Sequence, residues 1–120
     1  MSTAIDIYRG DDATATITLV ENGSAMDLTA AVVRMTFKRS VFETDEDAFL
    51  RKTSETDGGI EIDADPTSGR ITVAFVPEDT EDLVLPERFR YDVQVERGDT
   101  VRTIMTGRLG VRLDVTRTTS

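Results

Sequence analysis

The feature that most constrains this chain is an alternating stretch at residues 88–96, which reads RFRYDVQVE. Its apolar residues are aromatic or β-branched and share one parity; they are Phe89, Tyr91, Val93 and Val95. Because strand side chains point alternately to opposite faces, the pattern predicts a strand with one buried and one solvated face. A sheet with one apolar face must be covered by another layer. The stretch therefore predicts a protein of packed β-sheets.

Further alternating runs are separated by residues typical of turns, at a spacing of about 8 to 12 residues, which is typical of a sandwich or a barrel. Residues 76–83 predict a single short turn of helix, because proline and acidic residues favour a first helical turn. The other residues that we expect in the core are Ile17, Leu19, Val33, Met35, Phe37, Ile71, Val73, Phe75, Val111 and Leu113. The chain is thus expected to be all-β, with two apolar faces packed together.

Several segments carry more specific expectations. Residues 5–8 predict an edge strand, and residues 42–46 are acidic and aperiodic and predict an exposed loop. Apolar residues keep odd positions from 101 to 115, with Gly107 as a bulge or bend. Residues 116–120 form a polar tail that we expect to fray. At 120 residues, the whole of 1–120 is expected to be one domain.

Composition excludes several classes of function. The chain has no cysteine and no histidine, which removes disulfides, thiolate metal sites and the commonest acid–base group near neutral pH. The net charge of −9 disfavours a nucleic-acid partner. No apolar run approaches the roughly 20 residues of a membrane span, and the first residues do not form a signal peptide. We therefore expect synthesis in a cytoplasm. The scarcity of lysine is compatible with a GC-rich genome or a saline habitat.

Carboxylate pairs are the candidates for catalysis, since two acids at a set distance can hydrolyse a glycoside. Such pairs are Glu61 with Asp63, and Asp79 with Asp82. Both pairs lie in acidic runs that predict solvated turns. Without histidine or cysteine beside them, we predict that the protein is not an enzyme.

A calcium site is the second chemical candidate, because residues 63–65 begin like a calcium loop. However, Ser68 stands where an EF-hand loop needs glycine, and Ala74 where it needs a bidentate glutamate. A polar turn is therefore favoured, and no metal or cofactor is expected. Other acidic residues that could hold ions loosely are Asp11, Asp12, Asp45, Glu46 and Asp47.

The tripeptide Arg-Gly-Asp occurs twice, at residues 9–11 and as Arg97, Gly98 and Asp99. The second copy is expected at a hairpin tip, where an adhesion ligand would be displayed. Gly-Asp is also ordinary turn chemistry, which is the favoured interpretation. A free-standing binding or adhesion module is the alternative function that this tip leaves open.

A series of short motifs resembles a known family over nearly the whole chain. The motifs are YRGD at 8–11, NG at 22–23, DLTA at 27–30, the strand through 37, GRI at 69–71, Thr80, Leu83, FRYDVQV at 89–95, TI at 103–104, GRL at 107–109 and DVT at 114–116. This order is similar to the immunoglobulin-like N-terminal domain of tailed-phage baseplate upper proteins and related small virion proteins. The motifs are turns and core positions, so no catalytic or ligand residue is carried over.

The resemblance implies an immunoglobulin-like antiparallel β-sandwich that serves as a structural virion protein of a tailed phage, prophage or related virus. Baseplate proteins of this kind usually continue into a helical or receptor-binding region, whereas this sequence stops at Ser120. The place in the particle therefore stays open among tail, baseplate, neck and capsid surface. The implied partners are other virion proteins and copies of the chain in a homo-oligomer, without nucleic acid or membrane, after synthesis in the host cytoplasm.

Contacts in such an assembly are expected at an edge strand or at the least constrained loops. The acidic loop would suit a basic patch on a partner, and the outward Arg88 and Arg90 an acidic one. The residues that we predict for these contacts are Asp45, Glu46 and Asp47 in the loop and Arg97, Gly98 and Asp99 at the hairpin tip.

Overall fold

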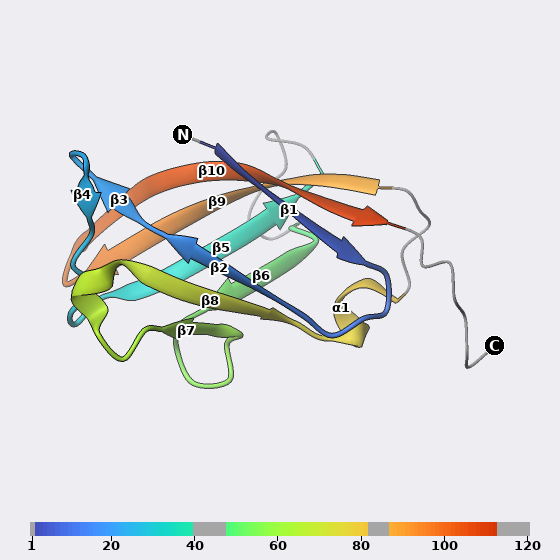
Figure 1. Cartoon of the computed structure of the whole chain (residues 1–120), viewed down its shortest axis with the longest axis horizontal. Coiled ribbons are helices and arrows are strands. Elements are labelled where there is room, and N and C mark those ends of the chain that lie inside the picture. The colour runs from blue at the N-terminus through green and yellow to red at the C-terminus, as the bar shows by residue number, and fades with distance from the viewer. Residues whose placement is uncertain (1, 40–47, 82–86, 113–120) are drawn as a thin grey trace.

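The computed structural model describes residues 2–39, 48–81 and 87–112, which form two packed sheets (Figure 1). The larger sheet has the strand order β1-β10-β9-β5-β6, and the smaller has the order β2-β8-β7. A third, two-stranded sheet pairs β3 with β4. The strands are β1 (Ser2–Tyr8), β2 (Ala13–Thr18), β3 (Val20–Glu21), β4 (Ser24–Ala25), β5 (Val32–Lys38), β6 (Leu50–Thr53), β7 (Ile60–Ile62), β8 (Arg70–Phe75), β9 (Glu87–Arg97) and β10 (Thr100–Arg112). The prediction of an all-β sandwich is confirmed.

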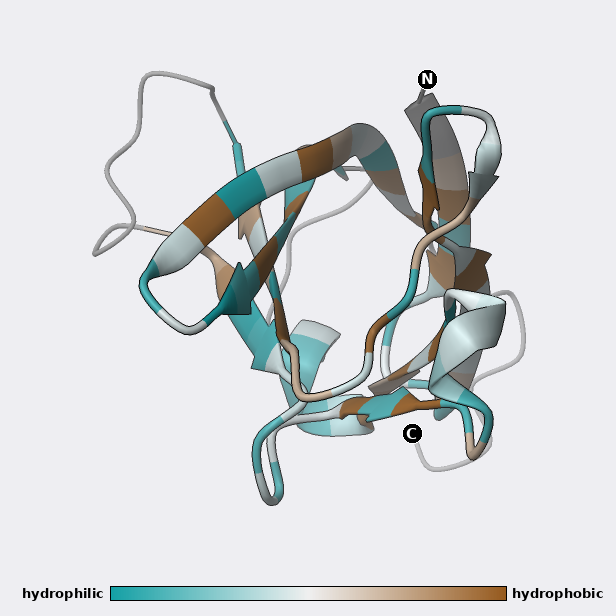
Figure 2. Cartoon of the chain, turned by 90° about the vertical axis from the view of Figure 1, so that its left-hand side faces the viewer, coloured by the Kyte–Doolittle hydropathy of each residue, from teal (hydrophilic) through white to brown (hydrophobic). Residues whose placement is uncertain are grey.

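The core lies between the two sheets and consists of the residues that strand parity predicts. Phe37 of β5 joins the layers, with its ring centroid 5.7 Å from Phe75 of β8 and 5.5 Å from Tyr91 of β9. Burial raises the pKa of Tyr91 to about 12. Every predicted core residue that the structure describes is buried, and Leu113 lies outside the described residues. Apolar and polar residues alternate along the strands in Figure 2.

Strand β9, which contains the alternating stretch, is central in the larger sheet. It pairs antiparallel with β5 on one side and with β10 on the other, so Val93 lies opposite both Met35 and Met105. Its even-numbered residues point to the outer face, and Arg88 and Arg90 are exposed as predicted. One alternating strand thus supplies apolar residues to the core and charged residues to the outer surface of the sheet.

The edge strand β1 departs from the antiparallel pattern. Its position at the edge is confirmed, but it runs parallel to β10, with Ile5 opposite Leu109 and Ile7 opposite Val111. Parallel neighbours require a long crossover, and here the crossover is most of the domain. The turn after β1 leads directly into β2 of the other sheet, so the first two strands belong to different layers.

The prediction for the first half of β10 was wrong. Gly107 was expected to form a bulge or a bend, but it pairs in register with Tyr91, and the irregularity lies between Thr103 and Met105 instead. The shift reverses the alternation of side chains before it. As a result Val101, which parity assigned to the apolar face, is 53% exposed.

The turns follow local chemistry. Asn22 and Gly23 both have positive φ, 54° and 82°, as a tight two-residue hairpin between β3 and β4 requires. The predicted helical turn is α1 (Pro77–Thr80), and a 3-10 turn (Pro66–Ser68) precedes β8. The predicted loop at 42–46 and the predicted tail at 116–120 lie outside the described residues.

Candidate interaction surfaces

The hairpin tip between β9 and β10 contains three of the residues predicted for contacts. Gly98 has φ 60°, and Arg97 pairs with Thr100, so turn geometry accounts for the Gly-Asp sequence. Arg97 donates a hydrogen bond from its guanidinium to the main-chain carbonyl of Asp27. An adhesion ligand would have to display both Arg97 and Asp99, whereas this contact holds Arg97 against its own fold.

Asp27 belongs to a compact turn beneath this tip. Its Oδ1 accepts hydrogen bonds from the Thr29 hydroxyl at 2.6 Å and from the Thr29 main-chain N–H at 2.9 Å. These bonds, the hydroxyl first, lower the pKa of the Asp27 carboxyl from its usual value, and the charge of Arg97 lowers it further. The carboxylate therefore helps to fix the position of the hairpin tip.

The acidic loop contains the other three predicted residues, Asp45, Glu46 and Asp47, which lie outside the described residues. Their part in contacts stays a prediction. The strands that flank residues 40–47 are β5 and β6, and β6 forms an edge of the larger sheet.

The candidate calcium segment forms a turn. Asp65 caps the 3-10 turn, with its Oδ1 accepting from Thr67 N–H at 3.1 Å and from the Thr67 hydroxyl at 2.6 Å. Asp63 contacts Ser68 Oγ at 3.1 Å and Arg70 Nε at 3.4 Å. Within residues 2–39, 48–81 and 87–112, no group of three or more acidic, histidine or cysteine side chains is arranged to hold a metal ion.

Of the residues in the two carboxylate pairs, Asp79 has a largely buried environment that the sequence did not predict. Its Oδ2 lies 2.8 Å from Lys52 Nζ, and the two side chains are 13% and 9% exposed. The same oxygen accepts a hydrogen bond from Val76 N–H at 3.0 Å, and Lys52 Nζ lies 5.6 Å from the centre of the Phe75 ring. Asp82 lies outside the described residues. Asp79 is thus an internal tie between α1 and β6, and its acidic run is not wholly solvated.

The register between β5 and β6 explains why Lys52 turns inward. Lys52 has the same parity as Leu50, and β6 pairs with β5 so that Lys52 lies opposite Met35 and Leu50 opposite Phe37. Both β5 residues are buried, so the register places Lys52 on the inner face. A lysine there requires a carboxylate partner, because an isolated buried charge is costly.

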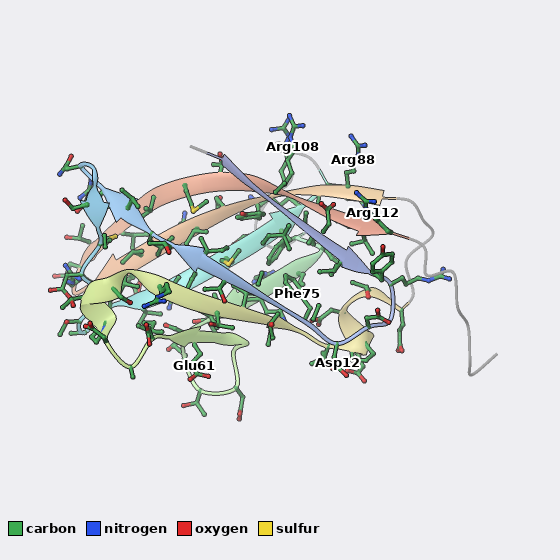
Figure 3. The ribbon with its side chains drawn as sticks, in the orientation of Figure 1. Asp12, Glu61, Phe75, Arg88, Arg108 and Arg112 are labelled. Carbon is green, nitrogen blue, oxygen red and sulfur yellow. The ribbon has the colours of Figure 1, made fainter. Side chains whose placement is uncertain are left out.

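The outer face of the larger sheet contains a group of arginines on neighbouring strands, which we call the arginine face; it consists of Arg88, Arg90, Arg108 and Arg112. Figure 3 shows Arg88 and Arg108 projecting from the sheet away from the core. Arg90 lies directly opposite Arg108, and Arg88 lies opposite Gly110. A Cβ at Gly110 would approach Asp6 Oδ1 to 2.6 Å, so the Asp6 side chain lies over Gly110. Asp6 also lines a shallow hollow together with Arg88 and Arg108.

Only one of these four arginines forms an ion pair with a residue that the structure describes. Arg112 Nε lies 3.8 Å from Asp6 Oδ1, but Arg88, Arg90 and Arg108 form no ion pair with any described residue. By contrast, Arg34 on the same outer face contacts Glu96 at 2.9 Å and Glu55 at 3.4 Å. Its hydrogen bond with Glu96 raises the pKa of Arg34 from its usual value. Arg34, near β6, is therefore neutralised by two glutamates, whereas Arg88, Arg90 and Arg108 have no acidic partner in the part of the chain that the structure describes.

Comparison with models of known protein families shows the family to which the chain belongs. Residues 1–106 match the family described as the BppU N-terminal domain. The chain belongs to the BppU N-terminal domain family. This match confirms the resemblance that the motifs suggested. No curated protein sequence matches the chain.

Membership in the BppU N-terminal domain family makes the chain a phage baseplate-associated structural protein. The carboxylates of Asp63 and Asp65 are engaged in the 3-10 turn, and that of Asp79 in an internal ion pair. Among the described residues, no helix is long and apolar enough to cross a membrane. The arginine face and the strand edges remain as the surfaces through which the chain could contact other proteins.

Proposed function

We propose that the chain acts in the virion as an immunoglobulin-like structural domain that joins neighbouring proteins and has no catalytic role. The single observation that supports this most strongly is the family match over residues 1–106. The proposed partners are other virion proteins and further copies of the chain, with no nucleic acid and no membrane. The chain would be made in the host cytoplasm and incorporated during assembly.

The immunoglobulin-like classification is supported by strand order. In constant-type immunoglobulin domains the first, second, fifth and fourth strands form one sheet, and the third, sixth and seventh form the other. Here β2, β8 and β7 correspond to the second, fifth and fourth strands, and β5, β9 and β10 to the third, sixth and seventh. Strand β6 extends the larger sheet as in variable-type domains, and β1 joins that sheet by parallel pairing.

Edges and faces suit this role, because a small sandwich can present them to neighbours without chemistry. The two packed sheets have four edge strands in the described part of the chain: β1 and β6 in the larger sheet, β2 and β7 in the smaller. The acidic residues 45–47 belong to the segment that connects β5 to β6 in the sequence. We propose that this loop, and the tip at residues 97–99, contribute contacts whose charges govern encounter and register more than affinity.

Mass spectrometry of purified particles tests the proposed role, and we expect the chain to be present at a fixed ratio to other baseplate proteins. Absence of the chain from intact particles would exclude the role. The surface is tested separately by replacing Asp45, Glu46 and Asp47 with Lys. We expect reduced incorporation with an unchanged circular dichroism spectrum, whereas normal incorporation would show that the acidic loop faces solvent.

A further inference from the structure

The arginine face has an energetic cost within the isolated chain. Arg90 of β9 lies directly opposite Arg108 of β10. Like charges directly across neighbouring strands destabilise a sheet. Neither Arg90 nor Arg108 has an acidic partner among the described residues. This arrangement favours an anionic partner that would neutralise Arg90 and Arg108 from another molecule.

The same chain carries an exposed acidic surface on its other side, which we call the acidic end; it consists of Asp11, Asp12, Glu78 and Glu81. All four side chains are exposed and form no ion pair with a described residue. They are held together because Gly10 N–H donates to Thr80 Oγ1 at 2.8 Å, which joins the turn after β1 to α1. Arg9 lies in the same turn and adds one positive charge there.

The two charged surfaces face in different directions. Figure 3 shows Arg88 and Arg108 on the outer side of the larger sheet and Asp12 on the opposite side of the sandwich, near α1. Opposite charges on separate surfaces of one molecule cannot satisfy each other within that molecule. They can do so between two molecules, because the arginine face has a shallow hollow lined by Arg88 and Arg108, and the side chains of the acidic end are exposed.

We propose that the arginine face of one copy binds the acidic end of the next copy. The contact is heterologous, since two different surfaces meet, and repetition generates a ring if the rotation closes or an open stack if it does not. The net charge of −9 does not prevent this contact at physiological salt, where charges more than about 8 Å apart are largely screened and the local pairs dominate. The inference rests on the proposed virion role and names the surfaces that copies would use.

The absence of cysteine from the chain allows a direct test by disulfide trapping. Arg108→Cys and Asp12→Cys are placed in one chain, which is concentrated and oxidised. A heterologous contact predicts a ladder or a closed ring of linked copies, and a mixture of the two single variants predicts mixed dimers. Monomers throughout, or dimers formed by Arg108→Cys alone, would overturn the proposal.

Reversal of charge at the two surfaces is the second test of the proposal. Changing Arg88, Arg90 and Arg108 to Glu should lower the self-association constant by at least about tenfold in sedimentation experiments, because like charges then face each other. Changing Asp12, Glu78 and Glu81 to Arg should do the same, and a mixture of the two variants should restore association. Arg51→Glu on the same outer face is the matched control and should have little effect; circular dichroism confirms that each variant is folded.

Particle incorporation separates failure of this inference from failure of the proposed function. If the unmodified chain is found in particles but its copies do not associate through these surfaces, the virion role stands and the self-contact is wrong. If the arginine-reversed variant also fails to enter particles while no contact between copies is trapped, the arginine face binds a different acidic protein, which likewise overturns the proposal.

Discussion

Each end of the sandwich carries an ion pair that joins two of its elements, and the two pairs differ in their exposure to solvent. At the end that contains α1, Lys52 and Asp79 lie 2.8 Å apart with side chains 9% and 13% exposed. At the end that contains the β3–β4 hairpin, Glu21 and Arg102 lie 2.5 Å apart with side chains 29% and 60% exposed (Figure 1). Because water screens the second pair far more than the first, distance alone does not indicate how much each pair matters.

The largest effect is expected at the buried pair. Changing Lys52 to Met leaves the Asp79 carboxylate without its cation and should cost about 3–5 kcal/mol of unfolding free energy, measured by denaturant titration. Replacing both residues, as Lys52→Met with Asp79→Leu, should recover most of that loss. The matched control is Glu78→Ala, the exposed acid next to Asp79, which should change stability by less than about 0.5 kcal/mol. A loss below about 1 kcal/mol in the single variant would show that the α1 end does not depend on this pair.

An intermediate effect is expected at Gly69, where the hairpin end is closed by backbone packing. Gly69 has φ 70°, and a Cβ there would lie 2.6 Å from the Leu19 carbonyl. Gly23 has φ 82° and nothing within 4 Å, so it reports the conformational strain alone. We expect Gly23→Ala to cost about 1–2 kcal/mol and Gly69→Ala about 1–3 kcal/mol more. Equal losses would mean that the close approach at Gly69 relaxes without cost.

The smallest effect is expected at the exposed pair. Changing Arg102 to Ala should cost about 0–1 kcal/mol, and added salt should reduce the difference from the unmodified chain. Glu21 Oε2 is itself buried and accepts no hydrogen bond from a described residue, so Arg102 is its described counter-charge. A loss as large as that at Lys52 would remove the contrast between the two ends.

Local pattern was sufficient to predict the parts of the fold that depend on one strand at a time. The alternation at residues 88–96 predicts which side chains are buried because a strand with one apolar face has a single favourable orientation. It also predicts that Arg88 and Arg90 point outward, which is one half of the arginine face. The contribution of Arg108 could not be predicted, because it depends on the register between β9 and β10 and on the shift between Thr103 and Met105.

Pairings between distant segments were beyond the sequence pattern for the same reason. The Lys52–Asp79 contact joins residues 27 positions apart, and an acidic run beside a proline resembles a solvated turn whether or not one of its carboxylates turns inward. The parallel partner of β1 was equally hidden, since a short alternating run fits either direction of pairing. Burial within a strand follows from the alternation of its residues, whereas these contacts depend on how the two sheets pack and pair.

The parallel pairing of β1 with β10 determines when the fold can be completed during synthesis. Ser2 pairs with Thr106 and Tyr8 with Arg112, so the first strand made has no partner until the end of the described chain is made. At about 5–20 residues per second, a ribosome needs roughly 5–20 s to extend the chain between those two points. For that interval Ile5 and Ile7, which are 7% and 5% exposed in the finished sandwich, have no sheet to join. The strand of the larger sheet that is synthesised first is therefore the last to find its partner.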